Sequence, residues 1–446
     1  MSTIELASAP EGAVRPRAGR HQPGSAPLAF ARDDSARRQP ARLPVLFLIA
    51  DTGGGHRSAA RAVAQALERL YPGRFGPVLC DPLGGPGSAR LLRRVTGLYG
   101  PAIRLAPWLW GAAYHATDSR AAAAVLRRTL LRLADRPALA AARAHRPAAV
   151  VSFHPLTGAA AVTARDRAAP GSPAVTVVTD LARIHAAWRY GGADLIVAPP
   201  AASAGLGAAG EPPWMAAALP ATREFWGGPL RGRGERAALR RSFCVREDRF
   251  LVLLTGGGEG SGGIGRRAAA ILRRLPDVDV VAVCGRNRRL RRRLDRLAAG
   301  SGGRLTVTGF TRDMAGWLRC CDLVVTKAGP GTIAEATCCG APLLLTSHVP
   351  GQERGNAEFV TRAGAGRRAR RVRRMLAEID DLRGDGSRLT EMRAASGRLG
   401  QPGAAAAIAE QIAALAGAGV AQGAGPAGVA DSAGRAVADD GRAGRC

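Results

Sequence analysis

A single lysine stands out in a chain whose other basic residues are arginines. Lys327 lies in the stretch VVTKAGPGTIAEA, and the other 63 of the 64 Lys and Arg residues are arginines. Asparagine is equally rare and occurs only as Asn287 and Asn356, so positions that keep either residue are candidates for a chemical requirement. An ammonium group is a compact point charge, whereas a guanidinium is a larger planar fork. Lys327 is therefore a candidate for contact with a diphosphate, and pairing with a nearby acid such as Asp322 is the alternative.

The residues after Lys327 predict a glycine turn that opens a helix. Gly329 and Gly331 leave the backbone amides accessible, and free N–H groups at a helix start attract anions. Thr332 and Glu335 have the spacing of a capping box, in which the Glu335 carboxylate would reach back to the helix start. The alternative is that Glu335 faces a ligand and accepts hydrogen bonds from a ribose diol.

The first glycine turn in chain order, ADTGGGHRSAARA, carries Asp51 and His56 at the start of another predicted helix. Imidazole titrates near neutral pH, so His56 is a candidate general base. A histidine that only caps or packs at a helix start is the alternative.

The second glycine turn in chain order, LLTGGGEGSGGIGRR, matches GxGxxG through Gly258, Gly260 and Gly263. A dinucleotide fold would place an acidic residue at the end of the next strand, but that strand ends in Gly285, Arg286 and Asn287. A nicotinamide enzyme is thus disfavoured, although Arg286 could serve a 2′-phosphate. The sequence contains no GxxxxGK[ST] motif and no Asp-x-Asp metal motif, and its cysteines lack the spacing of a metal site.

The segment GLYGPAIRLAPWLWGAAYHATDSR, which contains Trp108 and Trp110, mixes aromatic residues with arginines. This mixture suits a membrane interface. An ordinary core helix hairpin is the alternative.

Short apolar runs that alternate with helical patterns predict buried parallel strands in an α/β fold. The strands expected are Val45–Ala50, Ala149–Phe153, Ala174–Thr179, Leu195–Ala198, Phe250–Thr255, Val278–Cys284, Leu305–Gly309, Leu323–Thr326 and Pro342–Thr346. We expect two doubly wound Rossmann-like domains facing a cleft, with ligands beyond the carboxyl ends of the strands. The predicted boundaries are 42–225 for the first domain and 226–416 for the second, between a disordered tail at 1–41 and a low-complexity tail at 417–446.

The charge is compatible with a solvated arginine-rich surface and with attraction to an anionic partner such as lipid, nucleotide or nucleic acid, and it does not choose between them. The formal net charge is +29 over 446 residues, and the arginines are spread along the whole length. No apolar run reaches the length of a spanning helix. RRQPARLPVLFLIA mimics a twin-arginine signal, but its apolar run leads directly into the first glycine turn, so we expect a strand there. We expect the cysteines to be reduced and buried.

Several of these motifs together resemble the monogalactosyldiacylglycerol synthase group of glycosyltransferases, relatives of the peptidoglycan N-acetylglucosaminyltransferase that acts on lipid I. The matching segments are DTGGGHRSAA, VSFHPL, VTDLARIHAAW, GGGEGSGG, CGRNRRL, VTGFTRDMAGWLRCCDLVVTKAGPGTIAEA and PGQERGN. They occur in the order of that family and span roughly residues 45 to 366.

The resemblance implies a GT-B fold and an inverting transfer of a hexose from a UDP-sugar to the hydroxyl of diacylglycerol or a related lipid. It implies His56 as the base, with Asp51 close enough to tune it. On the donor side it implies a uracil wall, a diphosphate cradle, a ribose carboxylate and contacts to sugar hydroxyls. The residues are Gly258, Arg286, Phe310, Met314, Lys327, Gly329, Gly331, Thr332, Glu335, Gln352, Glu353 and Asn356.

On the acceptor side the resemblance implies Trp108, Trp110 and His154. We expect UDP-galactose or UDP-glucose as co-substrate, no metal or other cofactor, and a peripheral position on an anionic membrane at the cytoplasmic face. We expect no nucleic-acid partner. The alternatives are N-acetylglucosamine transfer to a polyprenyl-linked acceptor, UDP-sugar epimerisation, and a non-catalytic basic protein that binds membrane or nucleic acid.

Overall fold

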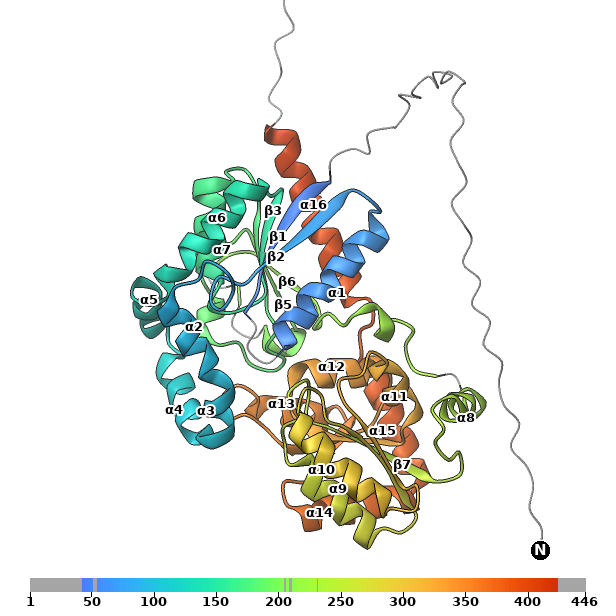
Figure 1. Cartoon of the computed structure of the whole chain (residues 1–446). Helices are drawn as coiled ribbons and strands as arrows, with labels where there is room; N and C mark the ends of the chain where they lie inside the picture. Colours follow the sequence, from blue (N-terminus) through green and yellow to red (C-terminus); the bar gives the residue numbers. More distant parts are fainter. Residues whose placement is uncertain (1–41, 51–53, 204–205, 208–210, 231, 424–446) are drawn as a thin grey trace, which may run out of the picture. The chain divides into compact units, whose positions relative to one another are not determined.

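A computed structural model describes residues 42–50, 54–203, 206–207, 211–230 and 232–423 (Figure 1). These residues form two six-stranded sheets in which every paired strand is parallel. The predicted α/β class, with two doubly wound parallel sheets, is confirmed.

The first lobe is built on a sheet with the strand order β2-β1-β3-β4-β5-β6. Its strands are β1 Leu43–Leu48, β2 Phe75–Cys80, β3 Ala149–Ser152, β4 Ala174–Val177, β5 Leu195–Ala198 and β6 Trp214–Ala216. Its helices are α1 Gly55–Leu70, α2 Arg90–Gly97, α3 Tyr99–Leu105, α4 Pro107–Thr117, α5 Arg120–Arg128, α6 Asp135–His145 and α7 Gly158–Ala168.

The second lobe has the order β12-β11-β10-β7-β8-β9, so its first strand, β7, lies inside the sheet. Its strands are β7 Phe250–Thr255, β8 Val278–Val283, β9 Leu305–Thr308, β10 Leu323–Lys327, β11 Leu343–Ser347 and β12 Gly366–Arg368. Its helices are α8 Arg233–Ser242, α9 Ile264–Arg274, α10 Arg288–Ala299, α11 Met314–Cys320, α12 Pro330–Cys338, α13 Arg354–Arg362, α14 Val372–Gly384 and α15 Gly386–Leu399.

The central strands are apolar on both faces because helices cover both sides of each sheet. All six residues of β8 are buried, and so are the last four of β1. The strands that the sequence did not predict are β2, β6 and β12, and all three are sheet edges. Edge strands are covered on fewer sides, so they lack the apolar run that marks a buried strand.

The last helix, α16, spans Ala404–Gly423 and crosses the predicted boundary between residues 416 and 417. It begins inside the region assigned to the second domain and continues past 417, where a loose tail was predicted. Ala405, Ile408 and Ile412 nevertheless belong to the core of the first lobe, and Figure 1 shows α16 beside α1. The alanine-rich repeat is helical here because it has an apolar face to bury.

Two chemical expectations can be compared with the described residues. None of their helices has the length and apolar character needed to cross a bilayer. Their seven cysteines are all free, and five are buried, whereas Cys244 is exposed.

Candidate active site

The first glycine turn brings His56 to the carboxyl end of β1. Gly54 caps α1 with a left-handed backbone, φ 81°, which glycine adopts without steric cost. His56 is the second residue of α1, so its position is set by the helix and not by a flexible loop. Asp51, the predicted tuning residue, lies outside the described residues.

The His56 ring is held through one nitrogen. Nδ1 lies 2.8 Å from the carbonyl oxygen of Phe153 and 2.8 Å from Oγ1 of Thr179. A carbonyl only accepts, so Nδ1 carries the proton and Nε2 is left with the lone pair. The side chain is 8% exposed, and this burial lowers the pKa of His56 to about 4. The neutral tautomer is therefore the resting form, and it presents a base at Nε2.

His154, which was expected on the acceptor side with Trp108 and Trp110, lies against His56. The two rings meet edge to face with centroids 4.3 Å apart. Burial, with the neighbouring His56, holds the pKa of His154 well below its usual range. Two neutral imidazoles in contact keep positive charge out of this region.

The loop after β4 joins the histidine to the second lobe. Thr179 contacts His56, while the next residue, Asp180, accepts a hydrogen bond of 2.7 Å from the Trp188 indole and another from the Gln352 side chain. Neither Thr179 nor Asp180 was singled out as a site residue from the sequence. The motif VTDLARIHAAW was the available signal, but no spacing rule links it to His56 or Gln352.

The second glycine turn is packed too tightly for side chains. The amide of Arg286 donates to the Gly258 carbonyl at 2.8 Å, and a Cβ at Gly285 would overlap that same carbonyl. The guanidinium of Arg286 lies 3.3 Å from a Glu259 oxygen and 5.3 Å from the ring centroid of Phe310. The turn thus presents Arg286 and an aromatic face together.

Phe310 and Met314 differ in exposure. Phe310 is 61% exposed, which is unusual for a large aromatic side chain. Met314 starts α11 and packs partly against the core of the second lobe. The geometry leaves Phe310, rather than Met314, free to stack on a flat ligand.

The turn after β10 places Lys327 beside Glu353. The Lys327 ammonium forms an ion pair with Oε1 of Glu353, whose Oε2 accepts from the Val349 amide at 2.8 Å. The alternative partner, Asp322, is instead bound by Arg240 and Arg236 at 2.6 and 3.1 Å. The alternative expectation, that Lys327 pairs with an acid, is thus met by Glu353 and not by Asp322.

A hydrogen bond from the Asn356 side chain holds the backbone of this turn. Its Nδ2 donates to the Ala328 carbonyl at 2.9 Å, and the residue is buried. Gly329 caps α12 and Pro330 occupies its first turn. At Gly331 nothing lies within 4 Å of where a Cβ would be, so the start of α12 is open to a ligand.

Glu335 does not take part in a capping box. The cap is Gly329, so Thr332 and Glu335 both lie inside α12, and no side chain caps the helix. The Glu335 carboxyl makes no hydrogen bond or ion pair with any described residue. Burial, with the nearby charge of Glu224, raises the pKa of Glu335 to about 8. A desolvated carboxyl without partners is suited to binding hydroxyl donors.

The helices α2 to α4 carry exposed apolar residues. Trp108 is 72% exposed, whereas Trp110 packs edge to face on Tyr99 with ring centroids 4.9 Å apart. Trp108 therefore fits the membrane-interface interpretation of this segment, and Trp110 fits the core-hairpin interpretation. We define the apolar face of α2–α4 by its exposed large side chains, which are Leu91, Val95, Leu98, Trp108 and Leu109.

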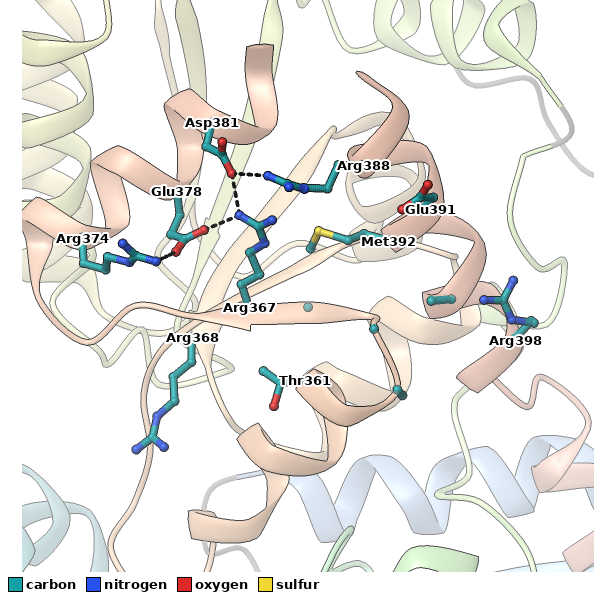
Figure 2. Close-up of a pocket in the computed structure, with 14 residues that line it drawn as sticks. Thr361, Arg367, Arg368, Arg374, Glu378, Asp381, Arg388, Glu391, Met392 and Arg398 are labelled. Carbon is teal, nitrogen blue, oxygen red and sulfur yellow. Dashed lines mark hydrogen bonds and ion pairs between the residues drawn. The ribbon is translucent and has the colours of Figure 1, made fainter. Parts of the chain in front are cut away.

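A pocket at the outer edge of the second lobe contains none of the predicted site residues (Figure 2). Arg367 binds both Glu378 and Asp381 at 2.6 Å, and Arg374 and Arg388 pair with the same two acids. Figure 2 shows these pairs converging across the pocket. They tie β12 to α14 and α15, so this cluster is structural.

No group of three or more His, Cys, Asp or Glu side chains among the described residues is arranged to hold a metal ion. The positive groups near the open start of α12 are the helix amides and Lys327.

Comparison with known proteins relates the chain to two sets of relatives. Residues 251–412 match the model of the glycosyltransferase family 28 C-terminal domain. A probable monogalactosyldiacylglycerol synthase 2, chloroplastic, of Oryza sativa subsp. indica is 33% identical over 335 residues, covering 72% of this chain and 69% of that protein. Monogalactosyldiacylglycerol synthase 2, chloroplastic, of Arabidopsis thaliana is 29% identical over 337 residues with the same coverage.

Solved structures share the fold at lower identity. MurG of Acinetobacter baumannii has a TM-score of 0.52 and 19% identity, covering 83% of this chain and 99% of its own. UDP-GlcNAc 2-epimerase of Neisseria meningitidis, bound to UDP-GlcNAc, has a TM-score of 0.54 and 13% identity, covering 83% and 100%. Since transferases and an epimerase share this architecture, the fold alone does not choose the reaction.

Proposed function

Because the chain belongs to the monogalactosyldiacylglycerol synthase family, we propose that it transfers galactose or glucose from the UDP-sugar to the hydroxyl of diacylglycerol or a related membrane lipid. The chain is a glycosyltransferase that uses a UDP-sugar and a lipid acceptor. The identity of the hexose, the roles of single residues and the membrane contact are parts of the proposal.

The observation that carries the proposal is the loop after β4. Its consecutive residues Thr179 and Asp180 contact His56 and Gln352, respectively. His56, the candidate base of the first lobe, is thus linked to Gln352, the candidate sugar-binding side chain of the second lobe, through two adjacent residues of one loop. An acceptor hydroxyl at His56 would then lie near the sugar that it attacks.

In the proposed reaction, Nε2 of His56 takes the proton of the acceptor hydroxyl. The hydroxyl oxygen bonds to the anomeric carbon while the bond from that carbon to the diphosphate oxygen breaks, which inverts the anomeric centre. Because Nδ1 is fixed on the Phe153 carbonyl, the base needs no tautomer change before it acts. Proton removal makes the weakly nucleophilic alcohol reactive.

The leaving UDP gains negative charge as the bond breaks. We assign its stabilisation to the open amides at the start of α12 and to Lys327, which can exchange Glu353 for a phosphate oxygen. We assign the ribose hydroxyls to Glu335, the uracil ring to Phe310, and the sugar hydroxyls to Gln352 and Glu353.

The membrane contact is proposed from the apolar face of α2–α4. Leu91 and Val95 of α2 and Leu98, which caps the end of α2, recur at helical spacing and share one side. Trp108 and Leu109 extend the exposed apolar surface on α4. Together with the net charge of +29, this face suits an anionic lipid surface. We propose that the protein binds peripherally at the cytoplasmic face of the cell membrane.

The experiment is donor-dependent UDP release on vesicles that contain diacylglycerol and an anionic phospholipid. Turnover with UDP-galactose or UDP-glucose, absent without diacylglycerol, supports the proposal. Turnover only with UDP-N-acetylglucosamine and a polyprenyl-linked acceptor would replace it with the alternative transferase. Salt-sensitive binding to nucleic acid without any turnover would indicate a non-catalytic binder.

A further inference from the structure

Asp180 is a buried carboxylate to which the proposed mechanism assigns no role. It is 4% exposed and follows β4 in the loop that also carries Thr179. Three donors face it, namely the Trp188 indole at 2.7 Å, the backbone of His185 and the side chain of Gln352. A carboxylate taken out of water is costly unless such donors are in place. This placement therefore calls for an explanation.

The contact with Gln352 has a definite chemical consequence. A glutamine amide has a donor end and an acceptor end, and either can face a ligand. An ionised carboxylate only accepts, so it takes the NH₂ end and leaves Oε1 free. Burial raises the pKa of Asp180 to about 6, and the three hydrogen bonds oppose that rise. Near pH 8 the group is ionised, and the orientation of the Gln352 amide is fixed.

The backbone just before Gln352 is held by residues of the first lobe. Gly111 packs so closely on Pro350 that a Cβ at 111 would lie 2.8 Å from the proline Cβ. Gly351, with φ 82°, lies against the ring of Tyr114 in the same way. With this backbone fixed, the remaining freedom at 352 is in the side chain. Asp180 is the group that restricts it.

We propose that Asp180 is a positioning residue for the donor sugar, which turns the Gln352 amide so that Oε1 accepts a hydrogen bond from a sugar hydroxyl. The inference rests on the proposed function, because it needs a UDP-sugar as substrate. It makes selection of the sugar depend on a residue of the lobe that binds the acceptor. Asp180 itself touches neither the sugar nor the acceptor.

The test compares Asp180→Asn with Asp118→Asn at pH 8. Asp118 is a matched control, since it is also a mostly buried carboxylate of the first lobe, but its hydrogen bonds go to Arg183 and the Ala186 amide. Asparagine at 180 can face Gln352 with either end, so the amide loses its fixed orientation. We expect KM for the UDP-sugar to rise about tenfold in Asp180→Asn, while the inhibition constant of UDP, which lacks the sugar, stays within twofold. Asp118→Asn should change neither.

A second variant keeps the test decisive if Asp180→Asn does not fold. Gln352→Leu removes the proposed sugar contact and leaves the bond between Trp188 and Asp180 intact, so it should reproduce the rise in KM without a change in UDP inhibition. Where both variants fold, the double variant should be no worse than either single one. Additive losses, a parallel change in UDP inhibition, or a wild-type KM in Gln352→Leu would overturn the inference. Absence of wild-type turnover with every UDP-sugar would instead refute the proposed function.

Discussion

Replacing Lys327 by arginine or methionine tests why one position kept a lysine. The ammonium lies beside Glu353, and a Cβ at Gly329 would lie 2.9 Å from Nζ. A guanidinium ends in two additional heavy atoms, which would have to fit beside the Gly329 backbone and the Glu353 carboxylate. Methionine keeps the length of the side chain but removes its charge. The arginine variant therefore tests size, and the methionine variant tests charge.

The expected magnitudes follow from burial. Overpacking in Lys327→Arg should lower the free energy of unfolding by about 1–3 kcal/mol. In Lys327→Met the Glu353 carboxylate, 5% exposed, keeps only the Val349 amide. Removing one partner of a buried ion pair lowers the free energy of unfolding by about 3 kcal/mol at the low end of the usual range. The low end is expected here because the Lys327 side chain is 23% exposed. Loss of a charged hydrogen bond to the diphosphate, about 1.5–3 kcal/mol, corresponds to a Kd for UDP that is roughly 10 to 100 times higher.

The assay is isothermal titration of each variant with UDP and with uridine, together with denaturant unfolding. Uridine is the internal control, because it has no phosphate for Lys327 to contact and its Kd should not change. A Kd for UDP within twofold of wild type in Lys327→Met would refute the contact with the diphosphate. Wild-type stability and UDP affinity in Lys327→Arg would refute the steric argument.

Three further predictions concern the base, the ribose site and the membrane. His56→Asn should lower kcat by about two to four orders of magnitude with UDP affinity within twofold; a UDP-release rate near wild type would remove the base assignment. A ribose diol binds best to the ionised form of Glu335, whose pKa is raised to about 8. The affinity for uridine, measured by titration, should therefore rise by up to about tenfold per pH unit from pH 6 to 8 and stay constant above pH 8. Glu335→Gln should abolish this dependence, and an unchanged pH profile in that variant would contradict it. Trp108→Ser with Leu109→Ser should weaken sedimentation with anionic vesicles at least tenfold without changing UDP affinity, and equal sedimentation would exclude this face as the contact.

The central strands of the fold were predictable because each is marked by a sequence pattern within its own segment. β7 is apolar up to its last residue, β8 is apolar apart from Asp279, and the glycine turns that follow β1, β7 and β10 mark the switch from strand to helix. Three of the four edge strands, β2, β6 and β12, could not be found this way. β6 reads WMA and β12 reads GRR, and each is a strand only because a neighbour supplies its hydrogen bonds.

The two asparagines illustrate what residue rarity can and cannot say. Their scarcity indicated chemical requirements, and both make specific hydrogen bonds. Asn287 caps α10 by accepting from the Leu290 amide at 2.9 Å, and Asn356 supports the turn that carries Lys327. These contacts are structural. The rarity of a residue type indicates that its position requires that residue, but it does not distinguish a ligand contact from a structural contact.

The site was predictable where a motif is continuous in sequence and was missed where contacts join distant segments. His56 follows β1 and Lys327 ends β10, each within its own motif. Thr179 lies 123 residues from His56, and Asp180 meets Gln352 of the other lobe. No periodicity or spacing encodes such pairs, since they form only when the sheets and loops are assembled.

The most direct measurement is the stoichiometry of transfer on diacylglycerol vesicles, with released UDP and the mass of the lipid product followed together. One glycolipid heavier by a single hexose should appear for each UDP released in the early phase, with His56→Asn slowing both equally. UDP-sugar consumed with no heavier lipid, or product formed at an equal rate by His56→Asn, would contradict the assignment of the reaction and its base.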